Sequence, residues 1–148
     1  MHSKLDKYIL LLQTLRIDHA HGEAPHKPVL LLSLLELIQL GFYPDNKIRV
    51  TPELVRTFKS TWESLVTTKH HCNMALPFYH LKSEPFWELI PKSGYEKIME
   101  MKLEMRSLKS LKKALDYAII DPDLFEAISK PSQNMILRQT ILDQYFPG

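Results

Sequence analysis

Helical spacing of apolar residues dominates the first half of the chain. It predicts an amphipathic helix over residues 4–17 and, between Pro28 and Gly41, a helix over residues 29–40 that is apolar on nearly every side. A helix that is apolar all round belongs in the centre of a core. Residues 52–66 show a third amphipathic pattern, preceded by a capping threonine. The sequence therefore predicts a helical core built around residues 29–40.

Strand-like patterns are shorter and fewer. Residues 47–50 alternate polar and apolar side chains, as a half-buried strand does. Residues 77–81 and 86–90 are two aromatic runs on either side of a Ser-Glu-Pro turn, which favours a β-hairpin. The expected β content is thus small.

The last third of the chain returns to helical spacing. Apolar residues from Tyr95 to Ile119 continue a helical pattern, and any break in it is expected near Ser107. Residues 121–128 and 131–145 then begin new helices at prolines. We expect a mainly α fold with a small β-hairpin, forming a single compact helical domain around the buried central helix.

Length and composition fit one ordinary globular domain. The 148 residues are 45% hydrophobic and 24% charged, unlike a disordered or fibrous chain. Cys72 is the single cysteine and we recognise no signal segment, so we expect no internal disulfide and a cytoplasmic location. The longest apolar stretch, residues 28–40, contains three polar residues and is too short to cross a bilayer, so we expect no membrane contact.

Charge is distributed unevenly along the chain. The net charge is +2, but residues 1–82 hold ten Lys or Arg against seven Asp or Glu, and the remainder holds nine against ten. The first part also contains all the histidines, which are His2, His19, His21, His26, His70, His71 and His80. A polyanionic partner is therefore expected to bind the first part.

Two segments are candidates for a binding site. The polar loop before the central helix ends in His26 and Lys27, and the N–H groups and dipole of a helix N-terminus favour an anion; a solvated His-rich loop is the alternative. An apolar turn over residues 75–78 follows a cationic loop, so Leu76 and Pro77 would be partly exposed beside the histidines. Its alternative is the start of a strand packed on the core.

A third segment, residues 69–73, suggests metal binding or catalysis, but its spacing does not support either. One cysteine with scattered histidines lacks the paired ligands of structural zinc sites. His71, Asn73 and His80 follow the letter order of an HNH nuclease motif, but at the wrong spacing and without carboxylates to hold Mg²⁺. Cys72 next to a histidine does not define a nucleophile and its base. We expect no metal, no cofactor and no catalytic residue.

Several segments occur in a distinctive order along the chain. They are residues 24–32, the helix ending at Trp62, Asn73, residues 76–81, residues 86–89 and residues 142–147. From about residue 20 to the end, this combination resembles the sulfur-binding domain of phosphorothioate-sensing HNH restriction endonucleases. The resemblance implies a non-catalytic domain that binds double-stranded DNA in which sulfur replaces a non-bridging phosphate oxygen. Residues 1–148 would be the N-terminal part of a longer enzyme of modification-dependent (type IV) restriction, whose separate HNH domain cuts the DNA.

The resemblance also assigns residues to the site. The sulfur would be bound by the basic pair before the central helix, the tip around the proline before Phe78, and their neighbours: His26, Lys27, Met74, Leu76, Pro77 and His80. Lys27 stands where the family often has arginine, and Leu76 where it often has tyrosine. Around this point, phosphates of the DNA backbone would be bound by Arg16, His19, His21, Lys47, Arg49, Lys69, His70, His71 and Asn73.

Sulfur recognition has a simple physical basis. Sulfur is larger and more weakly hydrated than oxygen, but the extra area it buries contributes well under about 1 kcal/mol at ~25 cal/mol per Å². An ordinary phosphate oxygen would lose hydrogen bonds to water in an apolar cup, at a cost of about 1–3 kcal/mol. Rejection of oxygen is therefore expected to dominate. The residues leave open a DNA-binding module without sulfur preference, a small metal nuclease using His71 and His80, and a protein-interaction domain that binds no DNA.

Overall fold

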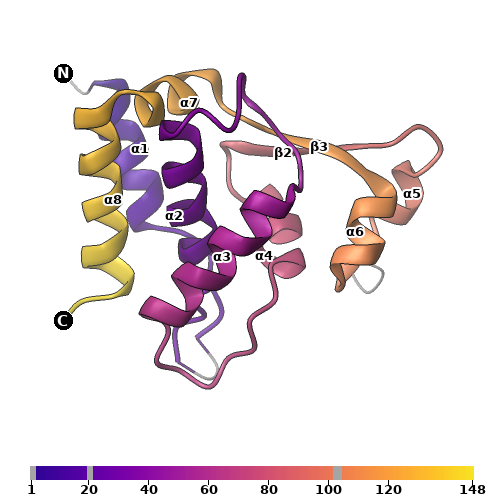
Figure 1. Ribbon diagram of the computed structural model, residues 1–148, viewed down its shortest axis with the longest axis horizontal. Helices are drawn as coiled ribbons and strands as arrows, with labels where there is room; N and C mark the ends of the chain where they lie inside the picture. Colours follow the sequence, from indigo (N-terminus) through magenta and orange to yellow (C-terminus); the bar gives the residue numbers. More distant parts are fainter. Residues whose placement is uncertain (1–2, 20–21, 102–104) are drawn as a thin grey trace.

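The computed structural model describes residues 3–19, 22–101 and 105–148. Figure 1 shows its elements, which in chain order are α1 (Lys4–Gln13), α2 (His26–Gln39), β1 (Lys47–Ile48), α3 (Pro52–Leu65), α4 (Ala75–His80), the 3₁₀ turn η1 (Leu81–Ser83), β2 (Trp87–Pro91), α5 (Glu96–Met99), α6 (Leu108–Ala114), β3 (Leu115–Ile120), α7 (Pro122–Ser129) and α8 (Pro131–Tyr145). The strands form one antiparallel sheet in the order β1-β3-β2. The expected mainly α class with a small β element is confirmed.

Helix α2 is the centre of the fold. Eleven of its 14 residues are buried, and it contacts α3, α4, α7 and α8. The buried amide of Asn134 on α8 donates to the carbonyls of Leu35 at 2.8 Å and Ile128 at 2.9 Å, which fixes α8 against α2 and α7. Among the described residues, no helix combines the length and the apolar character that a membrane span requires.

The start of α2 differs from the expected one. The sequence predicted a loop up to Pro28, but α2 begins two residues earlier, at His26, with Pro25 at the N-cap position. The N–H of Val29 donates to the carbonyl of Pro25 at 3.0 Å, which places Pro28 in the first turn. A proline is tolerated there because the first N–H groups of a helix have no helical partner. His26 and Lys27 are therefore fixed on a helix and do not belong to a loop.

Helix α1 ends at Gln13, four residues before the end that its spacing predicts. The hydroxyl of Tyr145 on α8 donates to the carbonyl of Leu12 at 2.6 Å and accepts the N–H of Leu15 at 3.0 Å. A side chain from the far end of the chain thus replaces helical hydrogen bonds at this point. Residues 15–19, which follow, have no regular structure.

The prediction of a β-hairpin from residues 77–81 and 86–90 is wrong. The first run forms α4 and η1, and the side-chain oxygen of Asn73, which precedes the N-cap residue Met74, accepts the N–H of Ala75 in the first turn of α4. Only the second run is a strand, β2, and it pairs with β3. Phe78 and Tyr79 are consecutive and both buried, which a helix packed in the core allows and a half-exposed strand does not.

Strand β3 replaces part of an expected helix. Helical spacing continues to Ile119 in the sequence, but α6 ends at Ala114 and residues 115–120 form the central strand of the sheet. Tyr and Ile side chains favour this extended conformation. The break in the helical pattern that was expected near Ser107 is present. The hydroxyl of Ser107 caps α6 by accepting the N–H of Ser110 at 3.1 Å, so a new helix begins there.

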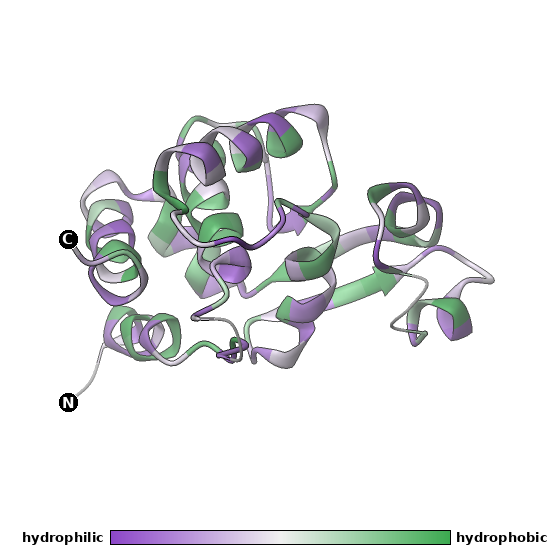
Figure 2. Cartoon of the chain, turned by 90° about the horizontal axis from the view of Figure 1, so that it is seen from below, coloured by the Kyte–Doolittle hydropathy of each residue, from purple (hydrophilic) through white to green (hydrophobic). Residues whose placement is uncertain are grey.

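The chain between β2 and β3 projects from the helical body (Figure 1), and we call residues 92–114 the arm. The arm contains α5 and α6, which contact each other. At its base, the N–H of Lys92 donates to the carbonyl of Ala114 at 2.8 Å. The view from below in Figure 2 also shows the arm at the opposite end of the molecule from the two termini. The arm is thus continuous with the β2–β3 pair of the body, and its helix α6 also contacts α4.

Candidate functional site

One surface depression brings together most of the predicted sulfur-binding residues. It lies between the segment after α1, the first turn of α2, and α4 with η1, and its volume is about 440 Å³. It is lined by Arg16, Ile17, Asp18, Ala24, His26, Lys27, His70, Leu76, Pro77, His80 and Ser83. Five of the six residues predicted to bind sulfur are in this lining. The sixth, Met74, does not line the pocket and is only 3% exposed.

The apolar side of the pocket is carried by α4. Leu76 is partly exposed at the second position of α4, as expected, whereas Pro77, also expected to be partly exposed, is buried because it packs within the first turn of α4. Asn73 fixes this turn, since its side-chain oxygen accepts the N–H groups of Ala75 at 2.9 Å and Leu76 at 3.4 Å. The amide of Asn73 also donates to the carbonyl of Arg106 at 2.9 Å. Asn73, predicted to contact DNA, therefore has both ends of its amide engaged within the chain.

Lys27 is buried at the pocket, and its charge is paired inside the protein. Its ammonium donates to the carbonyl of Arg16 at 2.7 Å, the hydroxyl of Ser83 at 2.9 Å and the carboxylate of Glu84 at 2.8 Å. An ammonium group has three donors, so all of them are engaged. The side chains of Lys27 and Glu84 are only 8% and 4% exposed. The lysine expected to meet a phosphate is thus already neutralised by a carboxylate.

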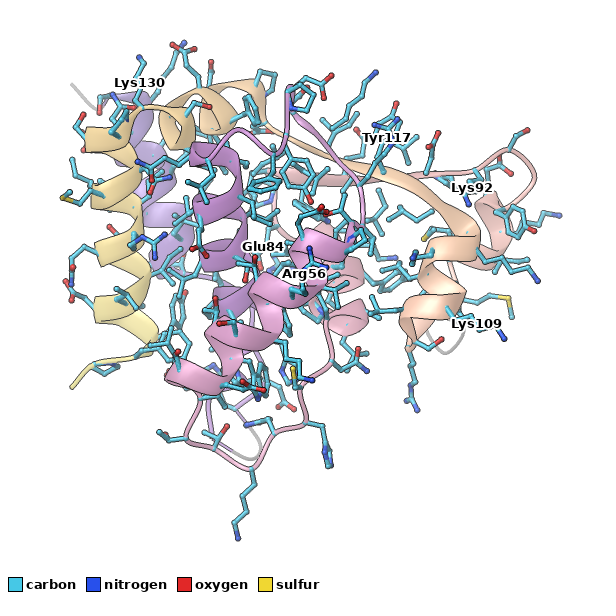
Figure 3. All side chains as sticks on the ribbon, in the orientation of Figure 1. Arg56, Glu84, Lys92, Lys109, Tyr117 and Lys130 are labelled. Atoms are coloured by element: carbon cyan, nitrogen blue, oxygen red, sulfur yellow. The ribbon has the colours of Figure 1, made fainter. Side chains whose placement is uncertain are left out.

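Glu84 joins the three segments that build the pocket. Besides the ion pair with Lys27, its carboxylate accepts the backbone N–H of Arg16 at 2.9 Å. Figure 3 shows Glu84 inside the helical body, in contrast to the surface lysines that it labels. Sequence reasoning did not identify Glu84. The one available signal is that it is the only acidic residue between Glu63 and Glu88.

His26 is held as a neutral ring. Its Nε2 lies 2.8 Å from the carbonyl of His71, and its ring centroid lies 4.7 Å from that of Trp62 and 5.8 Å from that of His70. Burial, and then the nearby His70, lower the pKa of His26, while the hydrogen bond to the His71 carbonyl acts in the opposite direction. The neutral ring donates through Nε2–H to that carbonyl, which leaves Nδ1 as a hydrogen-bond acceptor. His26 therefore adds a ring to the pocket but little positive charge near neutral pH.

The residues predicted to bind the DNA backbone are dispersed. Of those that the structure describes, only Arg16 and His70 line the pocket. Lys47 and Arg49 instead lie over the ring of Tyr117 at the sheet, with the Lys47 Nζ at 5.4 Å and the Arg49 guanidinium carbon at 5.0 Å from its centroid. The others outside the lining are His19, Lys69 and His71, which are exposed, and Asn73, described above; His21 lies outside the described residues.

The segment around Cys72 shows no assembled metal site. Within residues 3–19, 22–101 and 105–148, no group of three His, Cys, Asp or Glu side chains could hold a metal ion. Burial raises the pKa of the Cys72 thiol, although Lys59 nearby opposes the shift. The thiol is therefore mostly protonated near neutral pH, which disfavours it as a nucleophile.

Comparison with known proteins adds no relative. No protein-family model matches the chain, and no curated protein matches it. The pocket and its residues are therefore the basis for assigning a function.

Proposed function

We propose that the protein binds phosphorothioate-modified double-stranded DNA, with the sulfur seated in the pocket lined by His26, Lys27, Leu76, Pro77 and His80. The observation that supports this most is the convergence in one depression of the two sequence segments, one on α2 and one on α4, that the resemblance assigns to the sulfur site. They lie about fifty residues apart in the sequence, so their meeting in one depression does not follow from local sequence.

The pocket would select sulfur mainly by rejecting oxygen. Leu76 and Pro77 offer apolar surface, and neither can replace the water hydrogen bonds that a phosphate oxygen loses on entry. That loss costs about 1–3 kcal/mol, which corresponds to about a 5- to 150-fold preference for the modified duplex. Sulfur is weakly hydrated, so it loses less on entering the same surface.

The charges around the pocket suggest a revised role for Lys27. Because its three donors are engaged and its charge is paired with Glu84, we assign Lys27 to holding the pocket together. Arg16 is exposed and lines the same pocket, so it is the residue that would pair with the negative charge of the phosphorothioate.

The direct test compares duplexes that differ by one sulfur atom. Fluorescence anisotropy at fixed salt would measure Kd for modified and unmodified DNA, with each stereoisomer at phosphorus and several base contexts. We expect tighter binding of at least one modified duplex by about 5- to 150-fold. Equal Kd values for both duplexes would show a DNA-binding module without sulfur preference. Binding of neither duplex in any context would remove the proposal altogether.

A point variant locates the sulfur contact. Leu76→Asn places an amide on the partly exposed wall of the pocket, where it can hydrogen-bond a phosphate oxygen. We expect the ratio of the Kd for unmodified DNA to the Kd for modified DNA to fall towards one while the protein stays folded. The matched control is Leu10→Asn, because Leu10 is 60% exposed on α1 and does not line the pocket. An unchanged preference in Leu76→Asn would place the sulfur elsewhere.

In the proposed function the chain binds modified DNA but does not itself cut it. The resemblance assigns cutting to a separate HNH domain, and such a reader would act in the cytoplasm, where its DNA substrate would be. Incubation of the purified chain with modified DNA and Mg²⁺, Mn²⁺ or Zn²⁺ should leave the DNA intact. Cleavage that His80→Ala abolishes would favour the metal-nuclease alternative instead.

A further inference from the structure

The positive charge of the protein is concentrated in the arm. Residues 92–113 contain seven Lys or Arg against three Asp or Glu, whereas the rest of the chain has twelve against fourteen. A division of the chain at Lys82 hides this difference, because the acidic residues near the C-terminus offset the basic residues of the arm. The strongest local excess of positive charge therefore lies outside the pocket.

The basic residues of α6 share one face. Lys109, Lys112 and Lys113 stand at positions i, i+3 and i+4, which are neighbours on a helix surface. The opposite face carries Leu111 and Ala114, both buried. The three lysines are exposed, and none of their ammonium groups has a hydrogen-bond or ion-pair partner among the described residues. Figure 3 shows Lys109 extending from the arm into solvent.

The folded chain by itself does not require this arrangement. Lysines in the last turn of a helix interact favourably with the helix dipole, which accounts for Lys112 and Lys113. Lys109 lies in the first turn, where the dipole disfavours a positive charge, and it repels Lys113 one turn away. A polyanion bound along this face would remove both penalties.

The basic face is tied to the pocket by one side chain. The side-chain oxygen of Asn73 accepts the N–H groups of Ala75 and Leu76 in the first turn of α4, and its amide donates to the carbonyl of Arg106, two residues before α6 begins. Helices α4 and α6 also contact each other directly. The position of the basic face relative to the pocket is therefore set by folded structure and does not depend on a loose linker.

We propose that the exposed basic face of α6, formed by Lys109, Lys112 and Lys113, binds backbone phosphates of the same DNA duplex whose modified phosphate enters the pocket. The identity of the polyanion rests on the proposed function. Asn73 is a positioning residue in this arrangement. The face adds affinity that is independent of base sequence and of sulfur, because phosphate contacts carry neither kind of information.

The test is a salt titration of Kd for modified and unmodified duplexes. A plot of the logarithm of the binding constant against the logarithm of the salt concentration has a negative slope, and Lys109→Gln/Lys113→Gln should reduce the magnitude of that slope by about 1.8. The same variant should bind both duplexes about 10- to 60-fold more weakly near 0.1 M salt. The ratio of the two Kd values should stay the same. The matched control is Lys4→Gln/Lys130→Gln, which removes the same charge at α1 and α7–α8, and it should leave the slope unchanged.

A second variant tests the connection to the pocket. Asn73→Ser keeps a side-chain oxygen that can accept the N–H of Ala75 but loses the amide that reaches Arg106. We expect a thermal transition close to that of the unchanged protein, a preserved sulfur ratio and a smaller salt slope. A slope equal to that of the unchanged protein would show that Asn73 does not position the basic face.

The outcomes separate this inference from the proposed function. If the arm variant binds both duplexes like its control while the sulfur preference persists, the basic face does not contact DNA and the pocket proposal stands. If the unchanged protein binds both duplexes equally and the arm variant weakens both, the pocket proposal fails and the basic face stands. Stronger arm-dependent binding to single-stranded RNA than to duplex DNA would overturn the assignment of the partner.

Discussion

Removal of the Glu84 carboxylate should reveal how strongly the buried ion pair supports the pocket. Glu84→Gln keeps the size of the side chain and one acceptor oxygen, but leaves the ammonium of Lys27 without a counterion at a site where it is only 8% exposed. Removal of one partner of a buried ion pair costs about 3–5 kcal/mol. Lys27 keeps the Arg16 carbonyl and the Ser83 hydroxyl as acceptors, so we expect the lower end of this range, about 3 kcal/mol.

A loss of this size is easy to measure. For a domain of about 150 residues it lowers Tm by about 6–12 °C, which circular dichroism would detect, and urea unfolding would give the free energy directly. Glu126→Gln is the control, because Glu126 forms an exposed pair with Lys130 and should cost less than about 0.5 kcal/mol.

The double variant Lys27→Met/Glu84→Gln decides whether the pair is the cause. It should be more stable than the sum of the two single losses predicts, since the double change leaves no buried charge without its partner. Additive losses, or a loss below about 1 kcal/mol in Glu84→Gln, would refute the reasoning by showing that solvent reaches the pair.

Two further changes follow from the contacts described above. Because the pKa of His26 is lowered on folding, the unfolded chain binds more protons at this position, so the contribution of His26 to stability should be complete above its ordinary pKa of about 6.5 and decrease as pH falls below it. Urea unfolding from pH 7.5 to 5 should therefore show a weaker pH dependence in His26→Gln, and identical profiles would contradict the neutral ring. Asn134→Ala removes a buried amide that bonds two carbonyls and should cost about 1–3 kcal/mol, measured by the same method. A loss under about 0.5 kcal/mol would mean that water replaces the amide.

Local signals in the sequence were sufficient for the helices that begin at clear start sites. Thr51 caps α3 by accepting the N–H of Leu54 at 3.1 Å, and prolines begin α7 and α8 as expected. Each of these signals acts within one turn of helix. Residues 115–119, which were expected to be helical, instead depend on distant partners, because β3 is a strand that pairs with β2 about thirty residues earlier in the chain.

The same distinction applies to the pocket. Resemblance selected His26, Leu76 and Pro77, and the fold brings them into one depression. The state of Lys27 could not be predicted, because its carboxylate partner, Glu84, is 57 positions away and its burial depends on tertiary packing.

The attachment of the arm has a consequence for how the protein tolerates amino-acid substitutions. The arm joins the body through two paired strands and the bond between Asn73 and Arg106, and it buries side chains of its own, among them Met99 and Leu111. Such a unit can open locally at a free-energy cost below that of global unfolding. If the arm binds DNA phosphates as proposed, substitutions in it would weaken general DNA affinity while the pocket keeps its shape, so affinity and selectivity could change independently during evolution.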